Sequence, residues 1–281
     1  MNGRRAVILG GGGVTGLAWE IGVLRGLADE GLYLRNADSI IGTSAGAFAG
    51  AYLASGLIDR FYERQFEEAA VEIPAAMPPE TIESFRKAIA DGGGDDVVTA
   101  MALGRLAIAA RTVSAEERMA VVASRLPQDG WPDVLLQMTA IDAETGELCL
   151  LDRSSGVPLA TAAAASGAVP GLWPVVEAEG RKWIDGGSCS ATNARLGAAY
   201  DRVLVIAPVL DGSPGRPGTR DDIAKLTSHG VAVVLIAPDQ HAIEAIGNNP
   251  FDPARRGPAA DAGRLQGEAA APKAAILWNV T

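Results

Sequence analysis

Short runs of aliphatic and β-branched residues alternate along the chain with longer stretches that have helical periodicity. Gly, Pro or Asp bounds each short run, which is typical of buried strands. The predicted strands are Ala6–Leu9, Ser39–Ile41, Leu135–Ile141, Leu148–Leu151, Lys182–Ile184, Val203–Ala207 and Val231–Ala237. The predicted helices that follow several of them are Gly16–Glu30, Ala45–Ser55, Leu159–Ala165 and Ala191–Ala199. This order predicts an α/β fold with a central, largely parallel sheet.

Two segments depart from this alternation. Residues 59–126 contain no predicted strand and have a helical composition, broken at Ile73–Glu80 and Asp91–Asp96, so we expect a helical insertion beside the sheet. Residues 247–281 begin as a loop with several prolines and continue as an Ala-rich helix, which we expect to pack on the body as a C-terminal extension. With 281 residues, 48% of them hydrophobic, and no internal repeat or linker, the chain is expected to form one domain, 1–281.

Charge and apolar patterning exclude several classes of function. The formal net charge of −10 and the lack of a basic stripe argue against a nucleic-acid partner. No stretch approaches the ~18 apolar residues of a membrane span, so any lipid contact would be peripheral. The apolar run Ala6–Leu9 is shorter than the core of a secretory signal, which predicts a cytoplasmic protein. Cys149 and Cys189 are too few for a disulfide framework and are expected to be reduced thiols.

The first candidate for chemistry is the sequence Gly42-Thr43-Ser44-Ala45-Gly46. It follows a predicted strand and precedes a predicted helix, the context in which a G-x-S-x-G turn lifts a nucleophilic serine above a sheet. The helix N-terminus also directs N–H groups toward Ser44, which favours developing negative charge. The alternative is that Ser44 only caps the helix.

A glycine run, Gly10 to Gly13, connects the first strand to the first helix. Without Cβ atoms, several main-chain N–H groups can approach a substrate oxygen, so Gly11, Gly12 and Gly13 are predicted to form an oxyanion hole. A phosphate loop would require a lysine that is absent here. The dinucleotide pattern, completed by Gly16, lacks the acidic residue expected at the end of the second strand.

The candidate base is Asp185, which ends a predicted strand and is followed by Gly186 and Gly187. A carboxylate in a restricted cleft can accept the serine proton without an imidazole. Asp-Gly-Gly is also a common turn sequence, so the motif alone does not establish the role. The chain has two histidines, His229 and His241, and the order Ser, Asp, His leaves a triad hydrolase as an alternative.

Taken together, the glycine loop, the Ser44 motif and the Asp185 motif resemble those of the patatin-like phospholipases, in the same order along the chain. The Ala- and Ser-rich stretch Ala162–Val176 adds to the resemblance, which extends over about Val7–Ala207. The resemblance implies a three-layer α/β/α fold and a lipolytic acyl hydrolase that acts on a lipid or acyl ester. Ser44 would attack the ester carbonyl and Asp185 would take the serine proton. No metal or cofactor is implied.

One departure from the family pattern is Thr15, at a position where many members carry an arginine near the oxyanion. Without that charge the backbone N–H groups would stabilise the oxyanion alone, and a catalytically silent lipid-binding module of the same fold is a further alternative. Met101–Ile108 and Val169–Pro174 are candidate walls of an acyl-chain pocket, or parts of the ordinary core. Head group, chain length and oligomeric state do not follow from the sequence.

Overall fold

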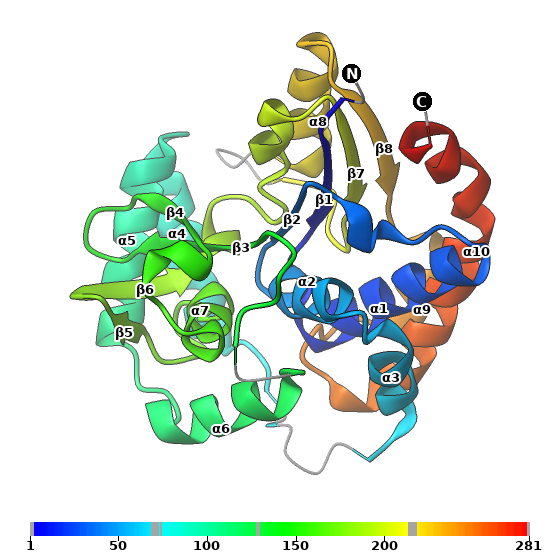
Figure 1. The fold of residues 1–281 in the computed structure, drawn as a ribbon. Helices are drawn as coiled ribbons and strands as arrows, with labels where there is room; N and C mark the ends of the chain where they lie inside the picture. Colours follow the sequence, from blue (N-terminus) through cyan, green and yellow to red (C-terminus); the bar gives the residue numbers. More distant parts are fainter. Residues whose placement is uncertain (1–2, 69–72, 74, 128–129, 213–217, 280–281) are drawn as a thin grey trace.

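In the computed structural model, residues 3–68, 73, 75–127, 130–212 and 218–279 are described, and their strands form one mixed sheet (Figure 1). The strands are β1 (Arg5–Leu9), β2 (Ser39–Gly42), β3 (Leu136–Asp142), β4 (Leu148–Leu151), β5 (Val176–Ala178), β6 (Arg181–Asp185), β7 (Arg202–Ile206) and β8 (Ala232–Ile236). Their order is β5-β6-β3-β2-β1-β7-β8, with β4 paired to β3. Strands β3, β2, β1, β7 and β8 are parallel, whereas β4, β5 and β6 pair in the antiparallel sense.

The register of the central strands brings two loops to one edge of the sheet. Leu9, the last residue of β1, pairs with Gly42, the last residue of β2. Because the strands are parallel, the segments that follow them leave the sheet side by side, at the edge where open α/β sheets bind ligands. The glycine loop and Ser44 are therefore neighbours.

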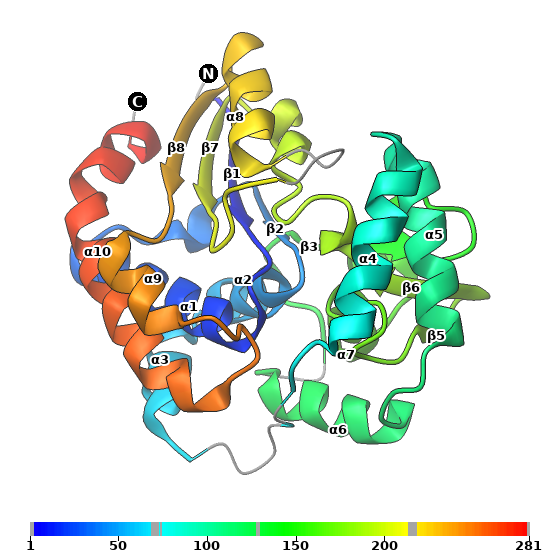
Figure 2. The ribbon, with the colours of Figure 1, turned by 180° about the vertical axis from the view of Figure 1, so that it is seen from behind.

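Helices cover both faces of the sheet, as Figures 1 and 2 show. The α-helices are α1 (Gly13–Asp29), α2 (Ala45–Ser55), α3 (Ile58–Glu63), α4 (Pro79–Gly92), α5 (Asp96–Ala109), α6 (Ala115–Arg125), α7 (Leu159–Ser166), α8 (Thr219–Ser228), α9 (Gln240–Ile246) and α10 (Arg256–Trp278). The 3-10 helices are η1 (Leu34–Asn36), η2 (Arg64–Phe66), η3 (Arg153–Ser155), η4 (Gly186–Ser188), η5 (Ala194–Ala199) and η6 (Pro253–Arg255). None of the helices in the described ranges has both the length and the apolar character needed to cross a bilayer.

Successive side chains of β1 point to opposite faces of the sheet, and the core has one layer on each face. Val7 and Leu9 belong to a cluster with side chains of α1, α2, α7 and α10. Ala6 and Ile8 face the other way, into a cluster that includes Leu226 of α8. This arrangement of helices on both faces of a mostly parallel sheet confirms the predicted three-layer α/β/α fold.

The described residues of the predicted insertion are helical, and α4 and α5 lie beside the β4–β6 end of the sheet (Figure 2). Leu103 and Ala107 of α5 pack in a cluster with Ile141 of β3 and Ile184 of β6. Helix α5 starts at a polar cap, because the Asp95 side chain accepts hydrogen bonds from two backbone N–H groups of the first turn. Residues 101–108 are thus mainly a support for the sheet.

The seven predicted strands are present, each within one residue of its predicted ends. The structure adds β5, whose three residues are too few for a periodic signal. The predicted helix Ala191–Ala199 is wrong: residues 190–193 form a turn, Asn193 has a φ of +49°, and only the 3-10 helix η5 follows. The cause is a set of buried polar contacts made by this turn, described below.

Candidate active site

Ser44 occupies a strained turn between β2 and α2. Its φ of +54° is rare for a residue with a side chain, and such backbone costs on the order of 1–3 kcal/mol. The flanking glycines make the turn possible: a Cβ on Gly42 would lie 2.4 Å from the Gly46 carbonyl oxygen, and one on Gly46 would lie 2.2 Å from that of Leu9. The Ser44 N–H donates to the Ser166 hydroxyl at 2.9 Å, which holds the turn from α7.

The glycine loop lies against Ser44, since a Cβ built on Gly11 would be 3.4 Å from the Ser44 Cβ. The Gly11 N–H already donates to the Ala191 carbonyl at 2.7 Å, so it holds the loop in place and is not available to an oxyanion. The N–H groups of Gly12 and Gly13 have no acceptor among the described residues. Gly13 begins α1 with a φ of +66°, a conformation that favours glycine. Two of the three predicted donors therefore remain available.

Gly16 contributes packing: a Cβ there would lie 3.1 Å from Cβ of Pro208. The loop that leads into α1 can thus sit close to the segment after β7.

Asp185 is the last residue of β6, and its side chain is 4% exposed. Its Oδ1 accepts a hydrogen bond from the Gly187 N–H at 2.6 Å. Gly186 must lack a side chain, because a Cβ would lie 2.2 Å from the Thr139 hydroxyl oxygen of β3. Strand β6 pairs with β3 in the antiparallel sense and β3 pairs with β2 in the parallel sense, which brings this carboxylate to the same region as the serine turn.

Ser44, Asp185 and the three glycines Gly11, Gly12 and Gly13 border one cavity of about 240 Å³. Its other walls are largely apolar and include Phe85, Val169, Pro170, Val209, Pro250 and Phe251. Of the two candidate acyl-chain walls, Val169 and Pro170 from the Val169–Pro174 turn line this cavity. Residues of Met101–Ile108 instead pack in the core, the alternative that the sequence left open, and Phe85 of α4 is the described insertion residue that lines the cavity.

A second, smaller pocket of about 20 Å³ also borders Ser44. It is lined by Arg118 and Arg125 of α6, and no carboxylate is among its described lining residues. Arg118 is 6% exposed, with its guanidinium 4.0 Å above the Trp173 ring centroid. Thr15 is fully buried, and its N–H donates to the Pro250 carbonyl at 3.1 Å. Positive charge near Ser44 therefore comes from α6 rather than from the glycine loop.

Glu20 is a buried carboxyl in α1, close to the start of the glycine loop. Burial raises its pKa well above the ordinary value, and the backbone of Gly10 acts in the opposite direction. Burial favours the uncharged form because it penalises the carboxylate, which cannot be solvated there.

The two histidines lie elsewhere. His229 follows α8, and its Nδ1 is 2.7 Å from the Lys225 carbonyl oxygen. His241 of α9 borders a different cavity with Phe66 and Glu244. Neither is among the described residues that line the cavity of Ser44 and Asp185, so the triad alternative has no imidazole at this cavity.

Sequence reasoning missed several residues that surround the site, above all Ser166, Asn193 and the arginines of α6. Ser166 and the arginines carry no local motif. Asn193 gave one usable signal, because Asn tolerates the left-handed conformation better than most residues. That signal was hidden by the Ala-rich residues around it.

Comparison with solved structures finds similarity to VipD from Legionella pneumophila, with 12% sequence identity and a TM-score of 0.44 over 97% of this chain and 67% of that chain. It also finds the type III effector protein ExoU, with 15% identity and a TM-score of 0.43 over 96% of this chain and 52% of that chain. The chain thus spans about half the length of the ExoU chain. No curated protein matched. The family model for patatin-like phospholipase matches residues 7–197, well over half of the sequence, and the chain therefore belongs to the patatin-like phospholipase family.

Proposed function

We propose that this chain is a serine acyl hydrolase that cleaves carboxylic ester bonds of lipids with Ser44 and Asp185. The observation that carries the proposal is the shared cavity: a strained serine, a nearly buried carboxylate and unoccupied backbone N–H groups border one apolar space. Nucleophile, base and oxyanion donors are the three groups that acyl transfer requires. The apolar walls suit an acyl chain.

In the proposed reaction, Ser44 Oγ attacks the ester carbonyl carbon while its proton passes to Asp185. The carbonyl oxygen becomes an oxyanion that accepts hydrogen bonds from the N–H groups of Gly12 and Gly13. The tetrahedral intermediate then releases the alcohol, which leaves with the proton from Asp185, and an acyl-Ser44 ester remains. Asp185 next takes a proton from water as the water oxygen attacks the acyl carbon. The bond to Ser44 Oγ then breaks, Asp185 returns the proton to Oγ, and the fatty acid is released.

The test is hydrolysis of soluble acyl esters of graded chain length by the wild type, Ser44→Ala and Asp185→Asn. We expect turnover of at least one ester, and a fall in kcat by a factor on the order of 10³ or more in both variants. Ser84→Ala is the matched control, since Ser84 is exposed on α4 and its hydroxyl donates to the Glu80 carbonyl of the same helix.

Turnover by folded Ser44→Ala at the wild-type rate would contradict the proposal. Absence of Ser44-dependent turnover for every ester would favour the catalytically silent lipid-binding module.

A further inference from the structure

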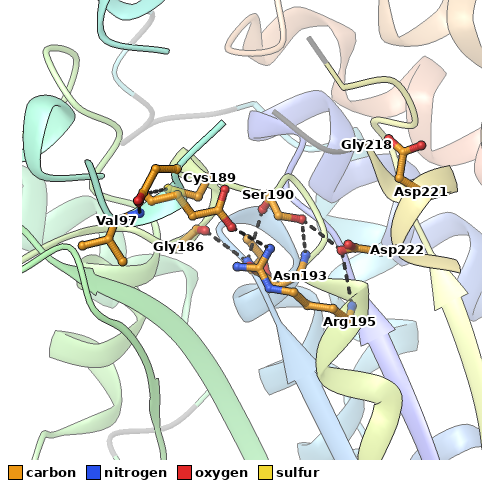
Figure 3. A network of polar contacts seen from close by, with 12 residues as sticks. Val97, Gly186, Cys189, Ser190, Asn193, Arg195, Gly218, Asp221 and Asp222 are labelled. Atoms are coloured by element: carbon orange, nitrogen blue, oxygen red, sulfur yellow. Dashed lines mark hydrogen bonds and ion pairs between the residues drawn. The ribbon is translucent and has the colours of Figure 1, made fainter. Parts of the chain in front are cut away.

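Asn193 is a fully buried residue in the turn between η4 and η5, at the centre of a polar network (Figure 3). Its side-chain Nδ2 donates to the Thr43 hydroxyl at 3.1 Å, the Gly186 carbonyl at 3.0 Å and the Ser190 carbonyl at 3.2 Å. Two of these acceptors are carbonyl oxygens, which cannot donate a hydrogen bond. A flipped amide would place Oδ1 against them, so these contacts fix the orientation of the Asn193 amide.

Two of the residues that Asn193 contacts are adjacent in sequence to Ser44 and Asp185. Thr43 directly precedes Ser44, and Gly186 directly follows Asp185. One side-chain amide therefore joins the serine turn to the aspartate loop, although these motifs are more than a hundred residues apart. The Thr43 hydroxyl, which follows β2, also accepts from Thr139 Oγ1 of β3 at 3.0 Å, so β3 and the turn of Asn193 both bind it.

The turn that carries Asn193 is itself anchored. Ser190 Oγ accepts the Asn193 N–H at 2.9 Å and donates to Asp222 of α8 at 3.4 Å, as Figure 3 shows. Asp222 is 1% exposed and also accepts from the Arg195 N–H at 3.3 Å. The amide is thus held from the face of the sheet opposite to α2.

We propose that Asn193 is a positioning residue that sets the Ser44 hydroxyl relative to the Asp185 carboxylate. The proposal rests on the proposed function, because it assigns Asn193 to the alignment of that pair. Loss of the amide would leave the substrate cavity lined as before, since Asn193 does not border it. The alignment would loosen, and a displacement of about 1 Å at reacting groups can lower a rate by about 10²-fold.

Two independent variants test this link. Asn193→Gly removes the amide and keeps a residue that adopts the left-handed φ without strain. Thr43→Val keeps the shape of Thr43 but removes the hydroxyl, while Thr43→Ser keeps the hydroxyl and serves as the conservative variant. Thr227→Val, at an exposed position of α8, is the matched control. The readouts are kcat and KM for a short soluble ester, and the rate of Ser44 modification by a fluorophosphonate as a function of pH.

We expect Asn193→Gly and Thr43→Val each to lower kcat and the modification rate by about 10- to 100-fold with KM nearly unchanged. Thr43→Ser should recover most of the rate, and the double variant should be little worse than either single one, because both remove one shared contact. Unchanged modification rates at every pH in folded Asn193→Gly or Thr43→Val, or losses that multiply in the double variant, would overturn the role of Asn193. Loss of the proposed function itself would appear differently, as wild-type modification that does not depend on Ser44.

Discussion

Replacement of Gly263 by alanine tests whether α10 is an integral part of the domain. Helix α10 lies alongside α1 (Figure 1). Glycines of each helix face the backbone of the other. A Cβ on Gly263 would lie 2.2 Å from the Trp19 carbonyl oxygen, and one on Gly22 would lie 2.1 Å from that of Ala260. The neighbouring atoms are backbone and cannot rotate away.

The size of the effect follows from these distances. Ordinary contact begins near 3.4 Å, so the helices would have to separate locally by 3.4 − 2.2 = 1.2 Å. Overpacking of this kind costs about 1–3 kcal/mol, occasionally more. Helix propensity alone would favour alanine over glycine by about 1 kcal/mol. Because the two effects have opposite signs, the sign of the change identifies the cause.

The assay is urea unfolding of the wild type, Gly263→Ala and Gly257→Ala. Gly257 lies in the first turn of the same helix, where a Cβ would meet only the ring of the exposed Phe66 at 3.2 Å and more distant atoms. Both variants gain helix propensity and only Gly263→Ala is overpacked, so we expect the free energy of unfolding of Gly263→Ala to be about 1–3 kcal/mol below that of Gly257→Ala. A Gly263→Ala protein as stable as the control, or more stable, would refute close packing of α10 on α1.

Two further predictions concern buried charge near the site. Glu20→Gln should stabilise the fold at neutral pH, because burial raises the pKa of Glu20 in the folded state. Wild-type stability should fall as pH rises from the ordinary carboxyl pKa toward the raised one, so the gain from Glu20→Gln should grow over that range; a pH-independent difference in urea unfolding would argue against it. Arg118→Gln should lower kcat/KM for phosphate-bearing acyl esters about 10-fold more than for uncharged ones, because Arg118 lines the pocket beside Ser44; equal losses would indicate packing alone.

The sequence predicted much of the fold because its signals are local. Strands such as Ser39–Gly42 are short β-branched runs between turn residues, and the helix Ala45–Ser55 follows directly. The interior of the site is less predictable, since its contacts join distant segments. The Gly11 N–H bonds to the Ala191 carbonyl, 180 residues away, and no local pattern shows that this donor is occupied. The turn before η5 has a helical composition, yet buried hydrogen bonds to Asn193 and Asp222 override that propensity.

The roles of Ser44 and Asp185 are tested most directly by identifying the residue that becomes phosphonylated and the residue that activates it. Mass-spectrometric mapping of a fluorophosphonate adduct on the wild type, Asp185→Asn and a His229→Ala/His241→Ala double variant measures both. We expect the adduct on Ser44, at similar rates in the wild type and the double histidine variant, and almost none in Asp185→Asn. An adduct on another residue, full labelling of Asp185→Asn, or loss of labelling in a folded double histidine variant would contradict the account.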